Sequence, residues 1–382
     1  MSNHPLTYLC IFNTTAGSFS RWEAQRIKEI LNKDPRSLKG EVFATRSQLD
    51  LEARLREYAD FYPDILGIGG GDGTASQTLT SVYNIWGSLP EIVAPFSMGT
   101  VNQWAAPPDL NDGLIDKAKK IVHWPSTKPI QLAKYLLRCA KKKELPHTQP
   151  LDLLDINGKK GFNTGFGAVP KVLWIYYGKT PEQYHRLEED LRNNLPQHYS
   201  RELNRIWNEK TLVDLISDGT GGLLKRSGAV YALSAAAYSM ASILDANRRE
   251  FFQGPFEGEI EIDGKKVEPE RLVNAVYVST YPGVNLGIKW INLLPAPDAG
   301  TEPGKMQIVL CTESLFGVVN QLPRLFAGEH LENVQYHSAA KLKLRSELPL
   351  VGHIEADFVV AKEFIIRYDR TLKVVAPFGK KS

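Results

Sequence analysis

Short apolar runs and amphipathic segments alternate along the first hundred residues. The apolar runs have the length of strands and are bounded by turn residues, and the segments between them carry apolar residues at helical spacing. The strand-like runs are 7–13, 41–46, 64–71 and 91–96, and the helix-like segments are 20–33, 49–62 and 74–86. This alternation predicts parallel strands joined by crossover helices, which is an α/β layer.

The second half of the chain has a different pattern. Beyond a Pro-rich, basic connecting stretch at 109–149, apolar and polar residues alternate over strand-length runs. The pairs Asn157-Gly158 and Asp263-Gly264 between such runs are typical of hairpin turns. Two helical patterns, at 180–215 and 224–247, interrupt the runs, and the apolar part of the second fits either a buried core helix or the wall of a lipid cleft. We expect a mainly antiparallel β domain here.

The length of 382 residues exceeds what one hydrophobic core usually absorbs, so we expect two domains. Their expected bounds are 1–130 for the α/β domain and 131–370 for the mainly β domain, with a helical insertion at 178–220. The net charge of +3 is too small to indicate a nucleic-acid partner. Basic runs such as Lys141–Lys143 are typical of solvated surface and could touch anionic head groups.

The three cysteines match no zinc or redox spacing, which fits a reducing compartment. No apolar stretch reaches the length of a membrane span. We therefore expect a cytoplasmic protein whose membrane contact is peripheral, at the inner face. The sequence leaves the oligomeric state open.

A glycine-rich run, Gly69-Gly70-Gly71-Asp72-Gly73-Thr74, follows one of the apolar strands and precedes a helical segment. Consecutive glycines carry no Cβ atoms, so the backbone can turn sharply and direct several N–H groups at one anion, and the helix adds its positive end. Asp72 would supply a carboxylate for a magnesium-water shell. The alternative is a tight turn in which Asp72 and Thr74 only cap the helix.

The glycine run lacks both the GxGxxG spacing of dinucleotide-binding folds and the GK[ST] ending of P-loops. It resembles the GGDGT signature of diacylglycerol-type lipid kinases, NAD kinases and ATP phosphofructokinases. A second segment, Pro95–Ala105, resembles the P-x-GT-x-N-x-x-A motif of the lipid-kinase branch. The chain is therefore identified as a member of the diacylglycerol kinase catalytic-domain family, which includes bacterial-type lipid kinases and sphingosine kinases within an NAD-kinase-like superfamily.

This resemblance implies an N-terminal NAD-kinase-like α/β domain and a C-terminal antiparallel β-sandwich-like domain. It also implies an ATP-dependent lipid kinase that uses Mg²⁺ and transfers the γ-phosphate to the hydroxyl of a diacylglycerol-like lipid at a membrane surface. The nucleotide-binding residues that it implies are Asn13, Thr45, Gly69, Gly70, Gly71, Asp72, Gly73, Thr74, Gly99, Thr100 and Asn102.

Two motifs depart from the family pattern. Glu355-Ala356-Asp357 stands where the family has D-G-E, whose glutamate is taken to be the catalytic base, so Asp357, Glu355 and Asp72 are the candidate catalytic acids. In the turn that resembles the family's metal-binding turn, Pro303 replaces an aspartate and leaves Glu302 as the candidate metal ligand. Because of these departures, a degenerate member that binds nucleotide or lipid without turnover is the alternative function.

Overall fold

The computed structural model describes residues 4–16, 20–98, 128–168, 170, 256–269, 272–281, 283–285, 292–321, 323–324, 329–355 and 357–376. Contacts divide the chain into two compact units. The first comprises 1–153, 158–161 and 370–382, and the second comprises 154–157 and 162–369. Several residues and segments singled out in the sequence lie outside the described residues: Gly99, Thr100, Asn102, the expected insertion at 178–220 and the apolar helical segment at 224–247.

The first unit is built on a parallel sheet. Its strands run in the order β4-β3-β1-β2, and the end of β16 pairs in parallel with β4. Asn13 lies opposite Thr45, and Gly70 lies opposite Ser97, so the carboxyl ends of four strands meet at one edge. The bounds are β1 Leu6–Asn13, β2 Leu38–Thr45, β3 Ile65–Gly70 and β4 Ile92–Ser97. The predicted alternation of strands and helices is confirmed.

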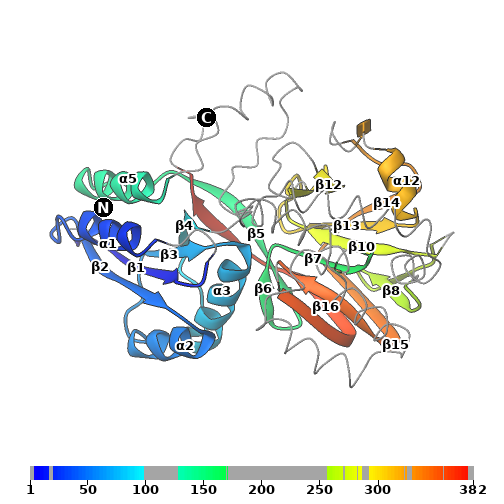
Figure 1. Cartoon of the computed structure of the whole chain (residues 1–382), viewed down its shortest axis with the longest axis horizontal. Coiled ribbons are helices and arrows are strands. Elements are labelled where there is room, and N and C mark those ends of the chain that lie inside the picture. The colour runs from blue at the N-terminus through cyan, green and yellow to red at the C-terminus, as the bar shows by residue number, and fades with distance from the viewer. Residues whose placement is uncertain are drawn as a thin grey trace, which may run out of the picture. The chain divides into compact units, whose positions relative to one another are not determined.

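Helices cover both faces of this sheet, with α1 and α5 on one side and α2 and α3 on the other (Figure 1). Ser20 and Ser47 start α1 and α2 as N-caps, because their hydroxyls accept hydrogen bonds from first-turn N–H groups. Alternate β1 side chains, Tyr8 and Phe12 among them, pack under α1 and α5. The bounds are α1 Arg21–Leu31, α2 Gln48–Glu57, α3 Asp72–Trp86 and α5 Pro129–Lys141.

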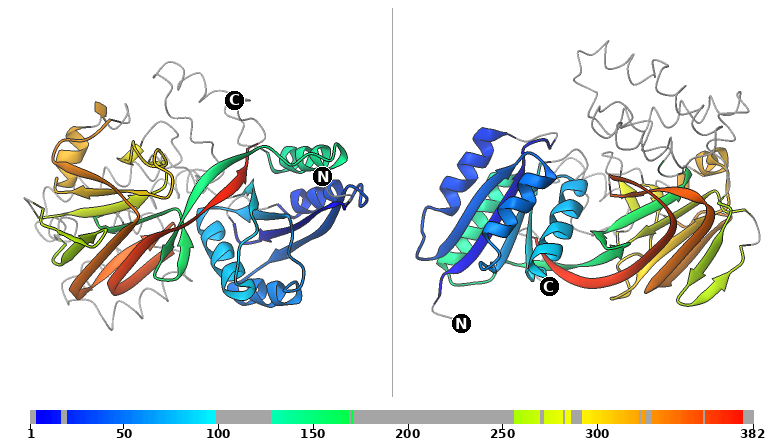
Figure 2. Two further views of the ribbon diagram at one scale, coloured as in Figure 1. Left: turned by 180° about the vertical axis from the view of Figure 1, so that it is seen from behind. Right: turned by 90° about the horizontal axis from the view of Figure 1, so that it is seen from below.

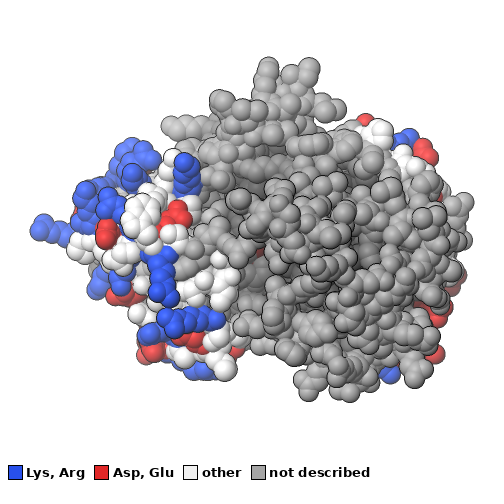
Figure 3. All heavy atoms as spheres, in the orientation of Figure 1, with Lys and Arg blue, Asp and Glu red and all other residues white. Residues whose placement is uncertain are grey.

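The expected domain boundary, between residues 130 and 131, lies within α5. This helix is amphipathic: Leu132, Leu136 and Leu137 are buried in the same core as Ile27 of α1. Its packing places the helix in the first unit. Basic side chains gather on the face of this unit that is visible in Figure 3.

The second unit is mainly antiparallel. Its strands run in the order β14-β13-β10-β7-β15-β16, with β8 beside β15 and β9 beside β8 (Figure 2). All these pairings are antiparallel, and short turns join the pairs β8–β9 and β15–β16, as antiparallel neighbours allow. The bounds are β7 Asn163–Gly167, β8 Glu259–Ile262, β9 Lys265–Val267, β10 Ala275–Ser279, β13 Met306–Cys311, β14 Val334–Ala339, β15 Lys341–Ile354 and β16 Asp357–Val375.

The remaining elements are short or shared between the units. β5 pairs with β6 and with β16, β11 and β12 form a separate two-stranded sheet, and α12 follows β13. Both predicted hairpin turns are confirmed, since Asn157, Gly158, Asp263 and Gly264 have φ of 50°, 84°, 47° and 79°, as two-residue turns between twisted strands require. The bounds are β5 Thr148–Ile156, β6 Lys159–Gly161, β11 Gly283–Asn285, β12 Asn292–Pro295 and α12 Leu315–Asn320.

Candidate functional site

The glycine-rich run forms a strand end, a turn and a helix start. Gly69 and Gly70 end β3, Gly71 is the N-cap of α3, and the helix begins at Asp72. A Cβ atom on Gly69 would overlap the Phe12 ring, and one on Gly70 would lie 2.5 Å from three side-chain atoms of Thr74. The first two positions therefore require glycine because neighbouring side chains approach the backbone so closely.

The N-terminus of α3 is suited to an anion. Gly71 has no side chain, and no side-chain hydrogen bond caps the helix. The first-turn N–H groups of an α-helix have no partner within the helix, and the macrodipole places partial positive charge beside them. Gly71 itself cannot supply the side-chain oxygen of an ordinary N-cap. The strand-to-helix geometry instead matches that of phosphate-binding loops.

Asn13 connects the end of β1 to the first turn of α3. Its Nδ2 donates to Thr74 Oγ1 at 3.0 Å, and its Oδ1 accepts from the backbone N and the hydroxyl of Thr15, at 2.9 and 2.7 Å. The Asn13 side chain thus orients the Thr74 hydroxyl beside the glycine turn.

Thr45 lies buried at the end of the neighbouring strand. Its carbonyl accepts from both the backbone N and the hydroxyl of Thr14, at 2.9 and 3.0 Å. A proline at position 14 could donate neither bond. The Thr45 hydroxyl is 3.5 Å from the carbonyl oxygen of Phe12. Of the expected nucleotide-binding residues that the structure describes, all lie at the carboxyl edge of the parallel sheet, where ligands of open α/β sheets bind.

Glu355 in the second unit is a structural cross-link. Its Oε1 accepts from the backbone N of Phe162 at 2.6 Å and of Asn163 at 2.9 Å, and its Oε2 accepts from Asn163 Nδ2 at 2.7 Å. The residue is only 6% exposed and has a left-handed φ of 54°. Three donors therefore hold a strained turn residue in place. Sequence reasoning did not find this role.

Asp357, the other acid of the triplet, begins β16 opposite Ile354 and is partly exposed. The two acids thus have different environments, although one residue separates them. Asp72 belongs to the first unit, and Glu355 and Asp357 belong to the second.

His353 supports the turn at Glu355. Its Nδ1 lies 3.0 Å from the carbonyl oxygen of Glu355. The residue belongs to β15, which lies between β7 and β16 in the sheet, and its side chain is buried. Burial lowers the pKa of His353 to about 4. The ring is therefore neutral at pH 7, and the geometry assigns its proton to Nδ1, which donates to the carbonyl of the strained residue.

Acidification should destabilise the protein through His353. The folded-state pKa of about 4 lies below the 6.5 of an unfolded histidine. The contribution of neutral His353 to the free energy of unfolding is therefore complete above pH 6.5. It falls by about 3 kcal/mol as the pH drops from 6.5 to 4. Urea unfolding at several pH values should show a shallower pH dependence for His353→Asn than for wild type, and an unchanged one for the control His4→Asn. Equal slopes for His353→Asn and wild type would contradict this role.

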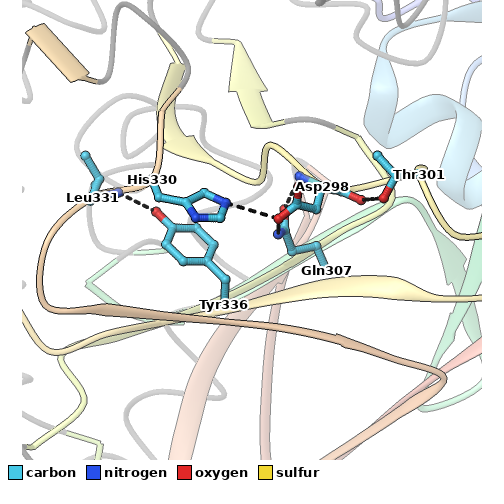
Figure 4. A network of polar contacts seen from close by, with 6 residues as sticks. All are labelled: Asp298, Thr301, Gln307, His330, Leu331 and Tyr336. Atoms are coloured by element: carbon cyan, nitrogen blue, oxygen red, sulfur yellow. Dashed lines mark hydrogen bonds and ion pairs between the residues drawn. The ribbon is translucent and has the colours of Figure 1, made fainter.

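Figure 4 shows a polar network around Asp298, which lies in the same turn as Glu302. Glu302 pairs with Lys305 Nζ at 2.6 Å, and both side chains are about half exposed. Asp298 Oδ2 lies 3.0 Å from His330 Nε2 and accepts from Gln307 Nε2 at 3.2 Å. Among the described residues, no group of three or more His, Cys, Asp or Glu side chains could hold a metal ion. The two carboxylates of this turn thus have protein partners: Lys305 for Glu302, and His330 and Gln307 for Asp298.

No helix within the described part of the chain combines the length and apolar character needed to cross a bilayer. This finding concerns only the residues placed in the structure.

Comparison with protein families matches residues 7–135 to the diacylglycerol kinase catalytic domain. None of the curated protein sequences matches the chain significantly. A solved diacylglycerol kinase from Bacillus anthracis str. Sterne is 14% identical, with a TM-score of 0.55 and 98% of each chain covered. Two structures of candidate diacylglycerol kinases from the same organism have TM-scores of 0.57 and 0.59 at the same identity and coverage. The chain shares their fold.

Proposed function

We propose that the protein is an ATP-dependent lipid kinase, because the chain carries a diacylglycerol kinase catalytic domain over residues 7–135. It transfers the γ-phosphate of ATP to the hydroxyl of a diacylglycerol-like lipid. The observation that supports this most strongly is the glycine strand end that leads into the uncapped N-terminus of α3. Phosphoryl transfer requires mainly positioning of the reactants and neutralisation of charge, and the carboxyl edge of the parallel sheet offers both.

In this proposal the backbone N–H groups between Gly70 and Thr74 bind the ATP phosphates. Asn13 orients Thr74 beside them through the 3.0 Å hydrogen bond. Asp72 is a partly buried carboxylate in the first helical turn, and it could accept hydrogen bonds from the water shell of a magnesium ion. That ion would neutralise the charge on the phosphates when ATP is bound.

Asp357 is the proposed base that orients or deprotonates the acceptor hydroxyl. Glu355 is a poorer candidate because its carboxylate accepts three structural hydrogen bonds. The same observation also favours the second candidate function, a degenerate member that binds its ligands without turnover, since one of the two acids has a structural role. Measured turnover separates the two functions.

Nucleotide binding tests the first step of the proposal. A ligand that binds only the folded state stabilises it by about 2.7 kcal/mol when its concentration is a hundredfold above Kd. ATP with Mg²⁺ should therefore raise the Tm of the purified protein, and ATP with EDTA should raise it less. The absence of any shift at millimolar ATP and Mg²⁺ would contradict the nucleotide site at Gly69–Thr74.

A further inference from the structure

The exposed face of α5 carries positive charge along its length. Between residues 128 and 143 every charged residue is Lys or Arg. The positions that face solvent recur three or four residues apart, so their side chains form one stripe. The exposed residues of this α5 stripe are Lys128, Gln131, Lys134, Arg138, Lys141, Lys142 and Lys143.

The opposite face of α5 is buried against the first unit, so the stripe cannot turn inward. Leu132, Ala133, Leu136 and Ala140 pack in the core with α1 and the sheet. One acid contacts the stripe in the described residues: Asp34 Oδ2 lies 4.0 Å from Lys141 Nζ. The packing therefore fixes a cationic surface that few described acids compensate.

A groove of about 560 Å³ lies between α1 and α5 beside the stripe. Trp22 lines it and is 70% exposed, and Ile130 contributes further apolar surface. The one acid lining the groove, Glu29, pairs with Arg26 at 2.8 Å, which leaves the charge of Lys134 uncompensated there. Leu145, just beyond α5, is 65% exposed.

We propose that this face, formed by the α5 stripe and the groove with Trp22, docks the protein on an anionic lipid bilayer. Lys and Arg side chains are attracted to the negative surface potential of anionic lipids. Tryptophan favours the boundary between head groups and acyl chains because its indole combines an apolar body with an N–H donor. The cationic stripe would suit a nucleic-acid backbone as well, but exposed Leu145, in addition to Trp22, adds aliphatic surface that a bilayer can bury.

The inference rests on the proposed function, since an enzyme that acts on a bilayer lipid must reach the bilayer. It goes further by assigning the contact to one surface of the first unit. Figure 3 shows basic side chains gathered on the visible side of this unit. The charge on the stripe predicts that binding weakens as salt rises, because exposed charges are screened.

Vesicle sedimentation with the full-length protein tests the docking face. Wild type should bind phosphatidylcholine vesicles that contain phosphatidylglycerol, bind pure phosphatidylcholine vesicles at least about tenfold more weakly, and dissociate at high salt. The triple variant Lys134→Glu, Arg138→Glu, Lys142→Glu should lose at least about tenfold in binding to anionic vesicles. Trp22→Ala should weaken binding even at low salt.

The control is a triple reversal of exposed lysines in the second unit, Lys265→Glu, Lys341→Glu and Lys362→Glu, which changes the net charge equally. It should bind nearly as wild type does, and all variants should have the wild-type circular dichroism and Tm. Equal loss in both triple variants, no loss in the α5 variant, or binding of the stripe to an acidic protein or oligonucleotide in place of vesicles would overturn the proposal. Vesicle binding by a wild type that transfers no phosphate would overturn only the proposed kinase function.

Discussion

Asp357→Asn should lower lipid phosphorylation by roughly 10² to 10⁴, the usual contribution of a positioned acid or base, and leave ATP binding intact. Asn keeps the shape of the side chain and removes its ability to take a proton. Asp357 starts β16 and is partly exposed, so the substitution should not disturb a core. Steady-state transfer and the ATP-dependent rise in Tm, measured on the same preparation, check both parts.

Glu355→Gln is the matched comparison and should act on stability. Three N–H groups now donate hydrogen bonds to the carboxylate. The NH₂ group of a glutamine would face at least one of these N–H groups, so that hydrogen bond would be lost. Hydrogen bonds to charged groups contribute about 1.5 to 3 kcal/mol each, so we expect a loss of at least about 2 kcal/mol in urea unfolding. The folded fraction should retain more transfer activity than Asp357→Asn. A reversed ranking of activity would make Glu355 the base and would contradict our assignment.

Asp72→Ala should abolish transfer, with a loss of roughly 10³ or more, because the carboxylate acts where negative charge must be neutralised. The fold should survive. An acid in the first turn contributes about 0.3 to 1 kcal/mol to a helix, so the loss of stability should stay within that range.

The control for Asp72→Ala is Asp50→Ala, which removes an acid from the first turn of α2, where its carboxylate accepts from the backbone N of Arg46 at 2.9 Å. This variant should lose similar stability and keep its activity. Unchanged turnover in a folded Asp72→Ala protein would remove the glycine turn from the chemistry.

The features that sequence predicts well here are local ones. The strand, glycine turn and helix of Gly69–Thr74 follow from adjacent residues, because only glycine tolerates the close approach of Phe12 and Thr74. The hairpins at Asn157-Gly158 and Asp263-Gly264 likewise follow from the left-handed φ that such pairs adopt. The edge that unites Asn13, Thr45 and Gly70 follows once the strands are recognised as parallel.

The features that sequence did not reveal depend on distant partners. The donor that holds Glu355 Oε1 at 2.6 Å comes from Phe162, 193 positions away, so the triplet alone makes its two acids look equivalent. The burial of His353 likewise depends on its neighbours in the sheet. The basic stretch that includes α5 resembles a linker in sequence, whereas in the structure the apolar side of α5 packs against α1. Glu302 resembles a metal ligand in sequence, whereas the structure pairs it with Lys305.

Lipid kinase activity is measured directly as transfer of ³²P from γ-labelled ATP to lipid. Purified wild-type protein with Mg²⁺ is incubated with dispersed diacylglycerol, phosphatidylglycerol, sphingoid base or ceramide, and the extracted lipid is counted, with Asp72→Ala as the blank. We expect label in at least one lipid, most readily diacylglycerol, for wild type and none above background for Asp72→Ala. No labelled lipid from a folded wild type that binds ATP, or equal labelling by both proteins, would contradict the proposed lipid kinase activity.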